Sequence, residues 1–143
     1  MIKDNKGQIS LEYMLIFAIS LILLIAFTLP LSHIAIERTS DVSNTLNVKS
    51  ELSKLSSAIS QVYSEGQGSK QTVYLDVNEV AYVRIANSYL SASLKLSDGQ
   101  SKVITLNHNS NLNSGGLNLD KGENKIIVEW PMGEEKMIIY KKY

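Results

Sequence analysis

The sequence predicts an α+β protein in which a long N-terminal hydrophobic and amphipathic α-helix packs against a small C-terminal antiparallel β-sandwich head. Residues 13–36 contain no Lys, Arg, Asp or Glu, and helical periodicity continues beyond them to about Glu65. From Gln71 onward the apolar residues recur with a period of two, which is typical of strands. The expected segments are a short leader at 1–7, a helix over 8–65 with its hydrophobic part at 8–36, and a β-rich head over 69–143.

A short basic segment precedes the apolar run, and one acidic residue stands at its entrance. Lys3 and Lys6, together with Asp4, give the first residues a weakly basic character. Glu12 begins the apolar region, and an ionised group at the centre of a membrane helix costs about 2.5–3.5 kcal/mol, less near an interface. A residue this unfavourable normally has a partner, so Glu12 is the first candidate functional residue.

Two simpler interpretations of the N-terminus were compared with a specialised one. An ordinary secretory signal has an apolar stretch of roughly 7–15 residues and then a small-residue cleavage site. The run here is longer, and residues 28–32 at its end provide no Ala-x-Ala site. A single-span anchor fits the length, because about 20 apolar residues cross a bilayer. In an anchor Glu12 would lie at the interface, near the positive end of the helix dipole. This alternative stays open.

Beyond the apolar run the helix is expected to be amphipathic. Its apolar residues recur mostly three or four positions apart, with one gap of six, and form a stripe of Val42, Leu46, Leu52, Leu55, Ile59 and Val62. Pro30 cannot donate a hydrogen bond to the Ala26 carbonyl, so we expect a kink or a locally melted turn there. Gly66 and Gly68 allow the chain to turn after Glu65.

Six short runs rich in β-branched and aromatic residues predict the strands of the head. They are residues 72–77, 80–86, 90–96, 102–106, 125–130 and 135–140, separated by turn residues at 97–99, 120–124 and 131–133. Segment 107–119 is expected to be an exposed, Asn-rich loop with room for one short strand near Leu117. We expect the apolar stripe of the helix to cover the open face of the β-structure.

Composition and motifs argue against several classes of function. Among 143 residues, 14 basic and 14 acidic side chains give a formal net charge of zero, so the basic patch of a nucleic-acid-binding protein is missing. Without cysteine the chain has no disulfide, thiol nucleophile or Cys-based zinc site. His33 and His108 belong to no nucleophile or metal motif, and Trp130 is expected to pack at the core rather than stack on a sugar. We therefore expect no enzymatic activity, no metal and no cofactor.

The order Gly-Gln-Ile-Ser-Leu-Glu-Tyr before the apolar run resembles the class III signal peptide of archaeal type IV pilin-like precursors. That family has Gln, Ser and Glu at alternate positions, which Gln8, Ser10 and Glu12 match, and Tyr13 also fits. The family pattern has Leu where this chain has Ile16, a conservative departure. The resemblance covers about the first 30 residues, and the head agrees with it only in architecture.

The resemblance implies a processing site and an assembly role. Prepilin peptidase, a membrane aspartic protease, would cut the precursor between Gly7 and Gln8. Glu12 would then neutralise the N-terminal amine of a neighbouring subunit. The precursor would lie in the cell membrane, and the pilus assembly machinery would transfer its helix into a filament at the cell surface.

The function implied by the resemblance is that of a structural subunit of an extracellular type IV pilus-like filament, which serves surface adhesion. The filament would be a homopolymer held together by the N-terminal helices. A minor pilin and an archaellin-like subunit are alternatives within the same superfamily. An alternative of another class is a monomeric, membrane-anchored binding module, for which the Asn-rich loop 107–119 would supply the ligand-facing surface.

Overall fold

The computed structural model describes the backbone of residues 5–143 and the side chains of residues 10–143. Residues 1–4 of the expected leader lie outside the described residues. At the expected cleavage site, Gly7 and Gln8, only the backbone is described, and it is helical.

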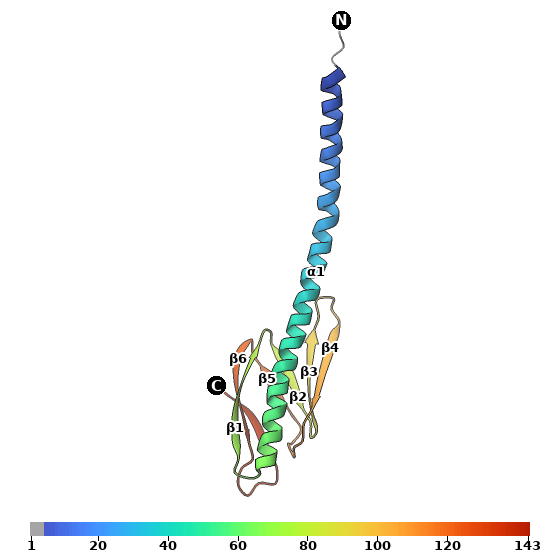
Figure 1. The fold of residues 1–143 in the computed structure, drawn as a ribbon. Helices are drawn as coiled ribbons and strands as arrows, with labels where there is room; N and C mark the ends of the chain where they lie inside the picture. The colour runs from blue at the N-terminus through green and yellow to red at the C-terminus, as the bar shows by residue number, and fades with distance from the viewer. Residues whose placement is uncertain (1–4) are drawn as a thin grey trace. The chain divides into compact units, whose positions relative to one another are not determined.

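Helix α1 (Asn5–Glu65) contributes to both of the compact units into which the chain divides after Thr39 (Figure 1). The backbone stays helical on both sides of Pro30, and the kink expected there stays a prediction. The helix ends at Gly66, which has a positive φ that glycine adopts without strain. The Gly66 amide donates a hydrogen bond of 3.1 Å to the Val62 carbonyl, which satisfies one of the last carbonyls of the helix.

The head, residues 40–143, contains seven strands: β1 (Lys70–Val77), β2 (Ala81–Ile85), β3 (Tyr89–Lys95), β4 (Ser101–Asn107), β5 (Gly115–Leu119), β6 (Gly122–Glu129) and β7 (Ile138–Lys142). They form two sheets, with the strand orders β1-β6-β7 and β4-β3-β2-β5 (Figure 1). Every pair of neighbouring strands is antiparallel. These sheets confirm the α+β fold with an antiparallel β-structured head.

Most of the strand boundaries differ from the sequence prediction by one to three residues, and the largest differences are at the starts of β6 and β7. Strand β6 already begins at Gly122, which pairs with Val77, and the buried Asn124 closes the turn before it: its side-chain amide donates to the Asp120 carbonyl at 2.7 Å and accepts from the Asp120 amide at 2.9 Å. The last strand was expected at 135–140, but β7 begins at Ile138 and ends at Lys142. Before it, Asn111 accepts from the Met137 amide at 3.3 Å and also donates to a backbone carbonyl, so this stretch bonds to a side chain instead of a strand.

The Asn-rich segment contains the short strand for which the prediction left room, since β5 includes Leu117. The expectation of an exposed loop is wrong at two positions before that strand. Leu112 joins the hydrophobic core with 2% of its surface exposed, and His108 is 5% exposed. These two buried side chains hold the loop against the head, although many of its neighbours are polar.

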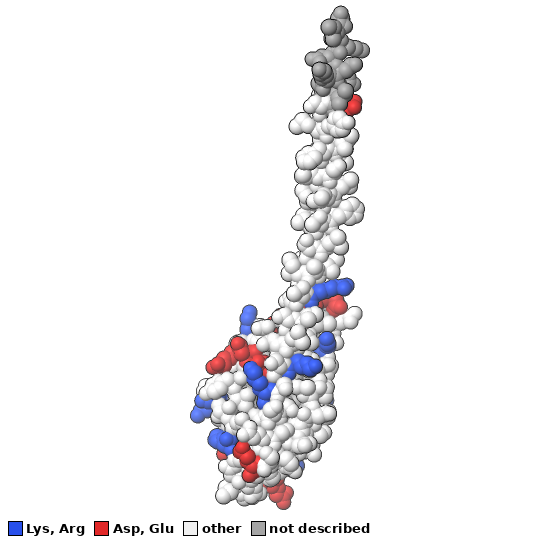
Figure 2. Space-filling view, in the orientation of Figure 1, with Lys and Arg blue, Asp and Glu red and all other residues white. Residues whose placement is uncertain are grey.

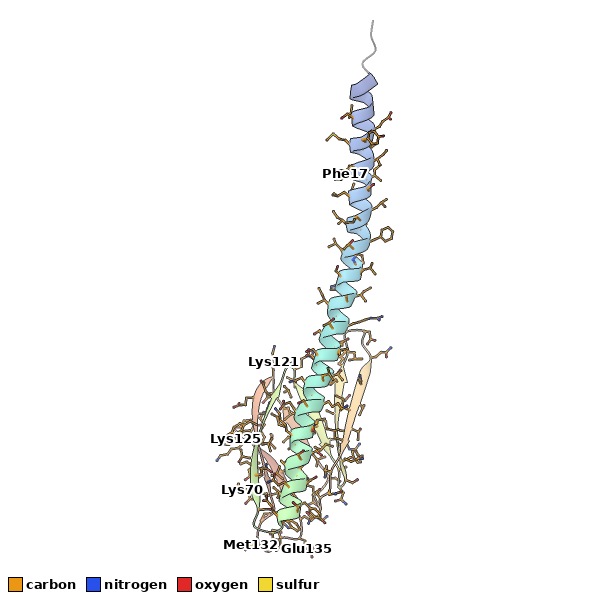
Figure 3. All side chains as sticks on the ribbon, viewed as in Figure 1. Phe17, Lys70, Lys121, Lys125, Met132 and Glu135 are labelled. Carbon is orange, nitrogen blue, oxygen red and sulfur yellow. The ribbon has the colours of Figure 1, made fainter. Side chains whose placement is uncertain are left out.

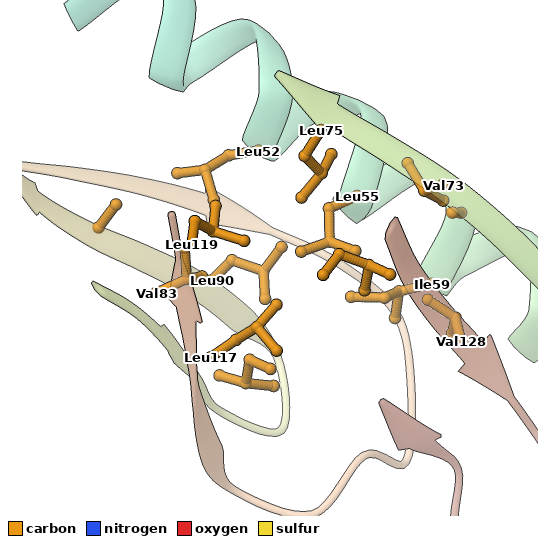
Figure 4. Packing of buried hydrophobic residues seen from close by; sticks show 14 of the residues in the cluster. Leu52, Leu55, Ile59, Val73, Leu75, Val83, Leu90, Leu117, Leu119 and Val128 are labelled. Carbon is orange, nitrogen blue, oxygen red and sulfur yellow. The ribbon is translucent and has the colours of Figure 1, made fainter. Parts of the chain in front are cut away.

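The core of the head lies between the two sheets and the last part of α1 (Figure 4). The helix buries Val48, Leu52, Leu55, Ile59 and Val62, each no more than 2% exposed. They point towards inward-facing residues of both sheets, so the helix closes one side of the sandwich. Burial of one such side chain stabilises a fold by about 1.5–3 kcal/mol, which makes this strip of the helix part of the head.

The predicted stripe is wrong in its first two members. Val42 and Leu46 are 59% and 60% exposed, whereas Thr45 and Val48 are buried. Counting from Thr45, the buried positions follow intervals of three and four without the gap of six. Val42 and Leu46 therefore lie outside the surface of the helix that meets the sheets.

Polar side chains also fix α1 to the turn between β1 and β2. The Asn47 amide donates to the Asp76 carbonyl at 3.0 Å and accepts from the Asn78 amide at 3.2 Å. Glu51, only 5% exposed, accepts from the Asp76 amide at 3.1 Å and pairs with Lys54 at 2.6 Å. These bonds satisfy backbone groups of the strand that its own sheet leaves free.

Candidate functional site

The part of α1 before the head presents apolar side chains in all directions. Residues 10–36 are all exposed to solvent. Phe17, for example, has 68% of its surface exposed, and Phe27 has 70%. Figure 3 shows side chains leaving this part of the helix on every side, and Figure 2 shows its surface free of Lys and Arg. A helix that is apolar all round requires lipid or other helices around it, because water would hydrate it unfavourably.

Two serine hydroxyls inside this apolar segment are bonded to its own backbone. Ser20 Oγ donates to the Ile16 carbonyl at 2.8 Å, and Ser32 Oγ donates to the Thr28 carbonyl at 2.9 Å. Such bonds to the residue four positions earlier let a serine enter an environment without water. These two serines are therefore compatible with an apolar environment.

The segment also has the length and boundaries of a membrane-spanning helix. From Ser10 onward α1 is long and apolar enough to cross a bilayer, judged by length and composition. Polar residues begin again at its far end. His33 Nε2 lies 3.2 Å from Glu37 Oε1, and Arg38 follows Glu37 in the sequence. The uncharged stretch is thus bounded by Glu12 on one side and this charged group on the other.

The signature residues do not form a cluster in the helix. Ser10, Glu12 and Tyr13 are all exposed, and within residues 10–143 no ion pair involves Glu12. At 100° per residue, positions 8 and 12 lie one turn apart on the same side, while position 10 lies on the opposite side. The helix therefore does not bring Gln8, Ser10 and Glu12 together, and their alternation would align them only in an extended chain.

Sequence reasoning missed a polar hollow of about 530 Å³ in the head. Its lining includes Ser60 from α1, Asn87 from the β2–β3 loop and His108 from the Asn-rich loop. His108 Nδ1 lies 3.0 Å from Ser110 Oγ. Because three distant segments meet there, only the unusual Asn content of residues 107–119 pointed to this place.

Comparison with known proteins identifies the N-terminus. The family model described as class III signal peptide matches residues 5–31. The match contains Gly7, Gln8, Ser10, Glu12 and Tyr13, and it ends within the apolar segment. No curated protein and no solved structure matches the chain significantly.

The match has direct consequences for the fate of the chain. A class III signal peptide implies processing by a prepilin peptidase and handling by a pilus assembly machinery. Together with the apolar helix, it indicates a membrane-anchored precursor of a secreted surface protein. The chain thus matches a class III signal peptide at residues 5–31, a region that includes most of the apolar part of a long helix, and this combination is consistent with a type IV pilin-like protein.

Proposed function

We propose that the protein is the structural subunit of an extracellular type IV pilus-like filament that serves surface attachment, and that it polymerises with itself through its N-terminal helix. One observation carries the proposal: residues 10–36 expose a continuous apolar surface, whereas the head already has a closed core. The apolar surface of the helix needs partners that the described chain does not supply. Identical helices of neighbouring subunits provide them.

The head completes its core without the apolar segment. The part of α1 from Thr45 to Val62 belongs to the core of the head, because its inward side chains are buried against the two sheets. The segment before it has no such role within its own unit. Assembly can therefore exchange lipid for neighbouring helices without unfolding the head.

Processing and packing then act in sequence. Removal of residues 1–7 takes away Lys3 and Lys6, which the positive-inside rule holds on the cytoplasmic side. The trimmed helix can leave the bilayer and pack against other copies. Because lipid tails are as apolar as leucine, van der Waals packing and polar pairing between helices must supply the preference for the filament.

Glu12 supplies the polar pairing in this proposal. A cut before Gln8 creates an α-amine, and Glu12 of a neighbouring subunit neutralises it in the apolar filament interior. A buried ion pair adds little net stability, but a register that leaves either charge unpaired is strongly disfavoured. Glu12 thus selects the register of assembly, and the protein has no enzymatic role.

Variants of Glu12 test the proposal in the producing cells. We expect Glu12→Ala to be cleaved and inserted normally but to form no filaments, as judged by electron microscopy and by the membrane fraction. Glu37→Ala, which removes the carboxylate at the other end of the segment, is the matched control and should assemble. Filaments of normal number and length from Glu12→Ala would contradict the role of Glu12.

A monomeric, membrane-anchored binding module is the second candidate, and the polar hollow beside His108 favours it. In that case the apolar helix would remain in the bilayer, and filaments would be absent from wild-type cells. A minor or archaellin-like subunit would instead appear within filaments built from another protein. Peptide mapping of sheared filaments distinguishes these outcomes, because a major subunit dominates the mass.

A further inference from the structure

Four loops meet at the end of the head where α1 terminates, and we call this region the loop end. It consists of the end of α1, residues 60–65, and the loops at 66–69, 86–88, 108–114 and 130–137. The last of these loops includes Met132 and Glu135, labelled in Figure 3. Antiparallel pairing places all four at the same end, because α1, β2, β4 and β6 arrive there and β1, β3, β5 and β7 depart from it.

The loop end contains the polar hollow of about 530 Å³. This volume lies within the range of roughly 300–1,000 Å³ that small-molecule sites occupy. A second hollow of about 780 Å³ shares Asn87 with the first and continues along Asn111 and Asn113. It also has one charged lining residue, Lys136, whose Nζ donates to Asn113 Oδ1 at 2.9 Å. The two hollows adjoin at Asn87, which gives room for a ligand of more than one unit.

The lining of the first hollow is hydrogen-bonding but uncharged. It consists of four serine hydroxyls, two asparagine amides, Tyr63 and His108, without any Asp, Glu, Lys or Arg. Burial lowers the pKa of His108 below its usual value of 6.5, and the backbone of Ala86 and Tyr89 offsets part of this effect. The imidazole is therefore neutral at pH 7, and the hollow has no charge with which to select an ionic ligand.

Contacts around His108 hold the hollow in shape. The His108 amide donates to the Ser88 carbonyl at 2.9 Å, and Ser60 Oγ on α1 accepts from the Asn109 amide at 3.3 Å. His108 Nδ1 is engaged by Ser110 Oγ, whereas its buried Nε2 has no hydrogen-bond partner among residues 10–143. A buried nitrogen without a partner is uncommon in a folded protein. Because this nitrogen is buried, it does not contribute to the accessible surface of the hollow.

Tyr63 adds an aromatic surface to this polar lining. Its ring stacks on Trp130 with 5.6 Å between centroids and 4° between planes, and 40% of the residue stays exposed. Trp130 packs against the core and donates from Nε1 to the Glu134 carbonyl at 2.8 Å. Trp130 thus supports Tyr63 from behind, and the flat ring of Tyr63 is fixed before any ligand arrives.

We propose that the loop end is a binding site for a neutral oligosaccharide. A pyranose ring has an apolar C–H surface that stacks on a fixed aromatic ring, and its hydroxyl groups bond to amides and hydroxyls. Tyr63 supplies the aromatic surface, and Asn87 and Asn109 of the same lining supply amides. The position of Asn87 between the hollows lets a second sugar unit continue towards Asn111. The site belongs to the head alone, so it stands whether or not the protein assembles.

An array of neutral and acidic oligosaccharides, probed with the full chain in a detergent without a sugar headgroup, tests this site. We expect some neutral glycans to bind. We expect no binding of glycans that consist only of acidic sugars. Titration of the best neutral glycan into ¹⁵N-labelled full chain should then shift amide signals at the loop end. Shifts confined to other parts of the head would overturn the assignment, as would no binding of any neutral glycan at millimolar concentration.

Substitutions of Tyr63 test whether its ring contributes to binding. Tyr63→Ala should weaken binding by at least about tenfold, equivalent to about 1.4 kcal/mol, while Tyr63→Phe keeps the ring and should retain most of the affinity. Tyr74→Ala and Asn118→Ala, which remove an exposed tyrosine and an exposed asparagine outside the loop end, serve as matched controls. Equal affinity of Tyr63→Ala and wild type in folded protein contradicts the proposal.

Discussion

Asp41 on α1 accepts hydrogen bonds from both the backbone amide and the hydroxyl of Ser97, at 3.1 Å and 2.8 Å, in the turn between β3 and β4. Among the side chains of residues 10–143, Asp41 is the first on α1 that bonds to a turn of the head. From Asp41 onward the helix is an integral part of the head, and its inward side chains are buried. The proposed function requires only that the residues before Asp41 contact lipid or other subunits, because the core of the head is complete without them.

The helical strip inside the head should determine its stability. Leu55 is completely buried, so Leu55→Ser should lower the free energy of unfolding by about 2–5 kcal/mol, through the cavity and the buried hydroxyl. Leu46→Ser is the matched control because Leu46 is 60% exposed, and it should change stability by less than about 0.5 kcal/mol. Urea unfolding of the full chain in micelles, followed by Trp130 fluorescence, measures both. Equal effects of the two variants would show that the helix is merely a stalk.

Gly116 lies against the side chain of Tyr82 on the neighbouring strand. A Cβ atom at position 116 would lie 1.9 Å from the Tyr82 hydroxyl oxygen, whereas one at Gly115 would meet nothing within 4 Å. Tyr82 is 55% exposed, so its ring can move into solvent, and we expect Gly116→Ala to destabilise the head by no more than about 1 kcal/mol. Gly115→Ala should be neutral or slightly stabilising, since it reduces the freedom of the unfolded chain.

A double variant shows whether the phenol causes the effect. Tyr82→Ala removes the ring, so adding Gly116→Ala to it should cost much less than in the wild type. The comparison is a double-mutant cycle on thermal unfolding. Additive losses would mean that the glycine is needed for another reason.

His108 should make the head less stable in mild acid. Its pKa is lower in the folded than in the unfolded state because burial disfavours the charged ring. The unfolded state therefore binds more protons below about pH 6.5, so this contribution to stability is complete above that pH and declines as the pH falls further. Thermal unfolding at about pH 7.5 and about pH 5 should show a larger loss for wild type than for His108→Asn. The exposed His33→Asn should behave like wild type.

The elements of the fold could be predicted because each has its own period in the sequence. The uncharged run 13–36 and the three-and-four spacing after it define the helix, and the alternation from Gln71 defines the strands. The stripe was misassigned at Val42 and Leu46 because the face that meets the sheets contains the polar Thr45, which a search for apolar residues passes over in favour of its exposed neighbour Leu46. The start of β7 was misplaced because the distant Asn111 replaces its pairing partner.

The two candidate sites differ in how far the sequence reveals them. The signal peptide is read along the chain, so Gln8, Ser10 and Glu12 suffice to recognise it. The hollow at the loop end is assembled from Tyr63, Asn87 and residues near His108, which are far apart in the sequence. Only folding brings them together, so no local sequence pattern predicts a site of this kind.

The intact mass of the protein in filaments sheared from the cell surface tests the central claim most directly. Filament formation through class III processing predicts a chain that begins at Gln8, with residues 1–7 removed, as the main component of the filaments. A protein that keeps Met1, is cut after Ser32, or is found only in the membrane fraction would contradict the account.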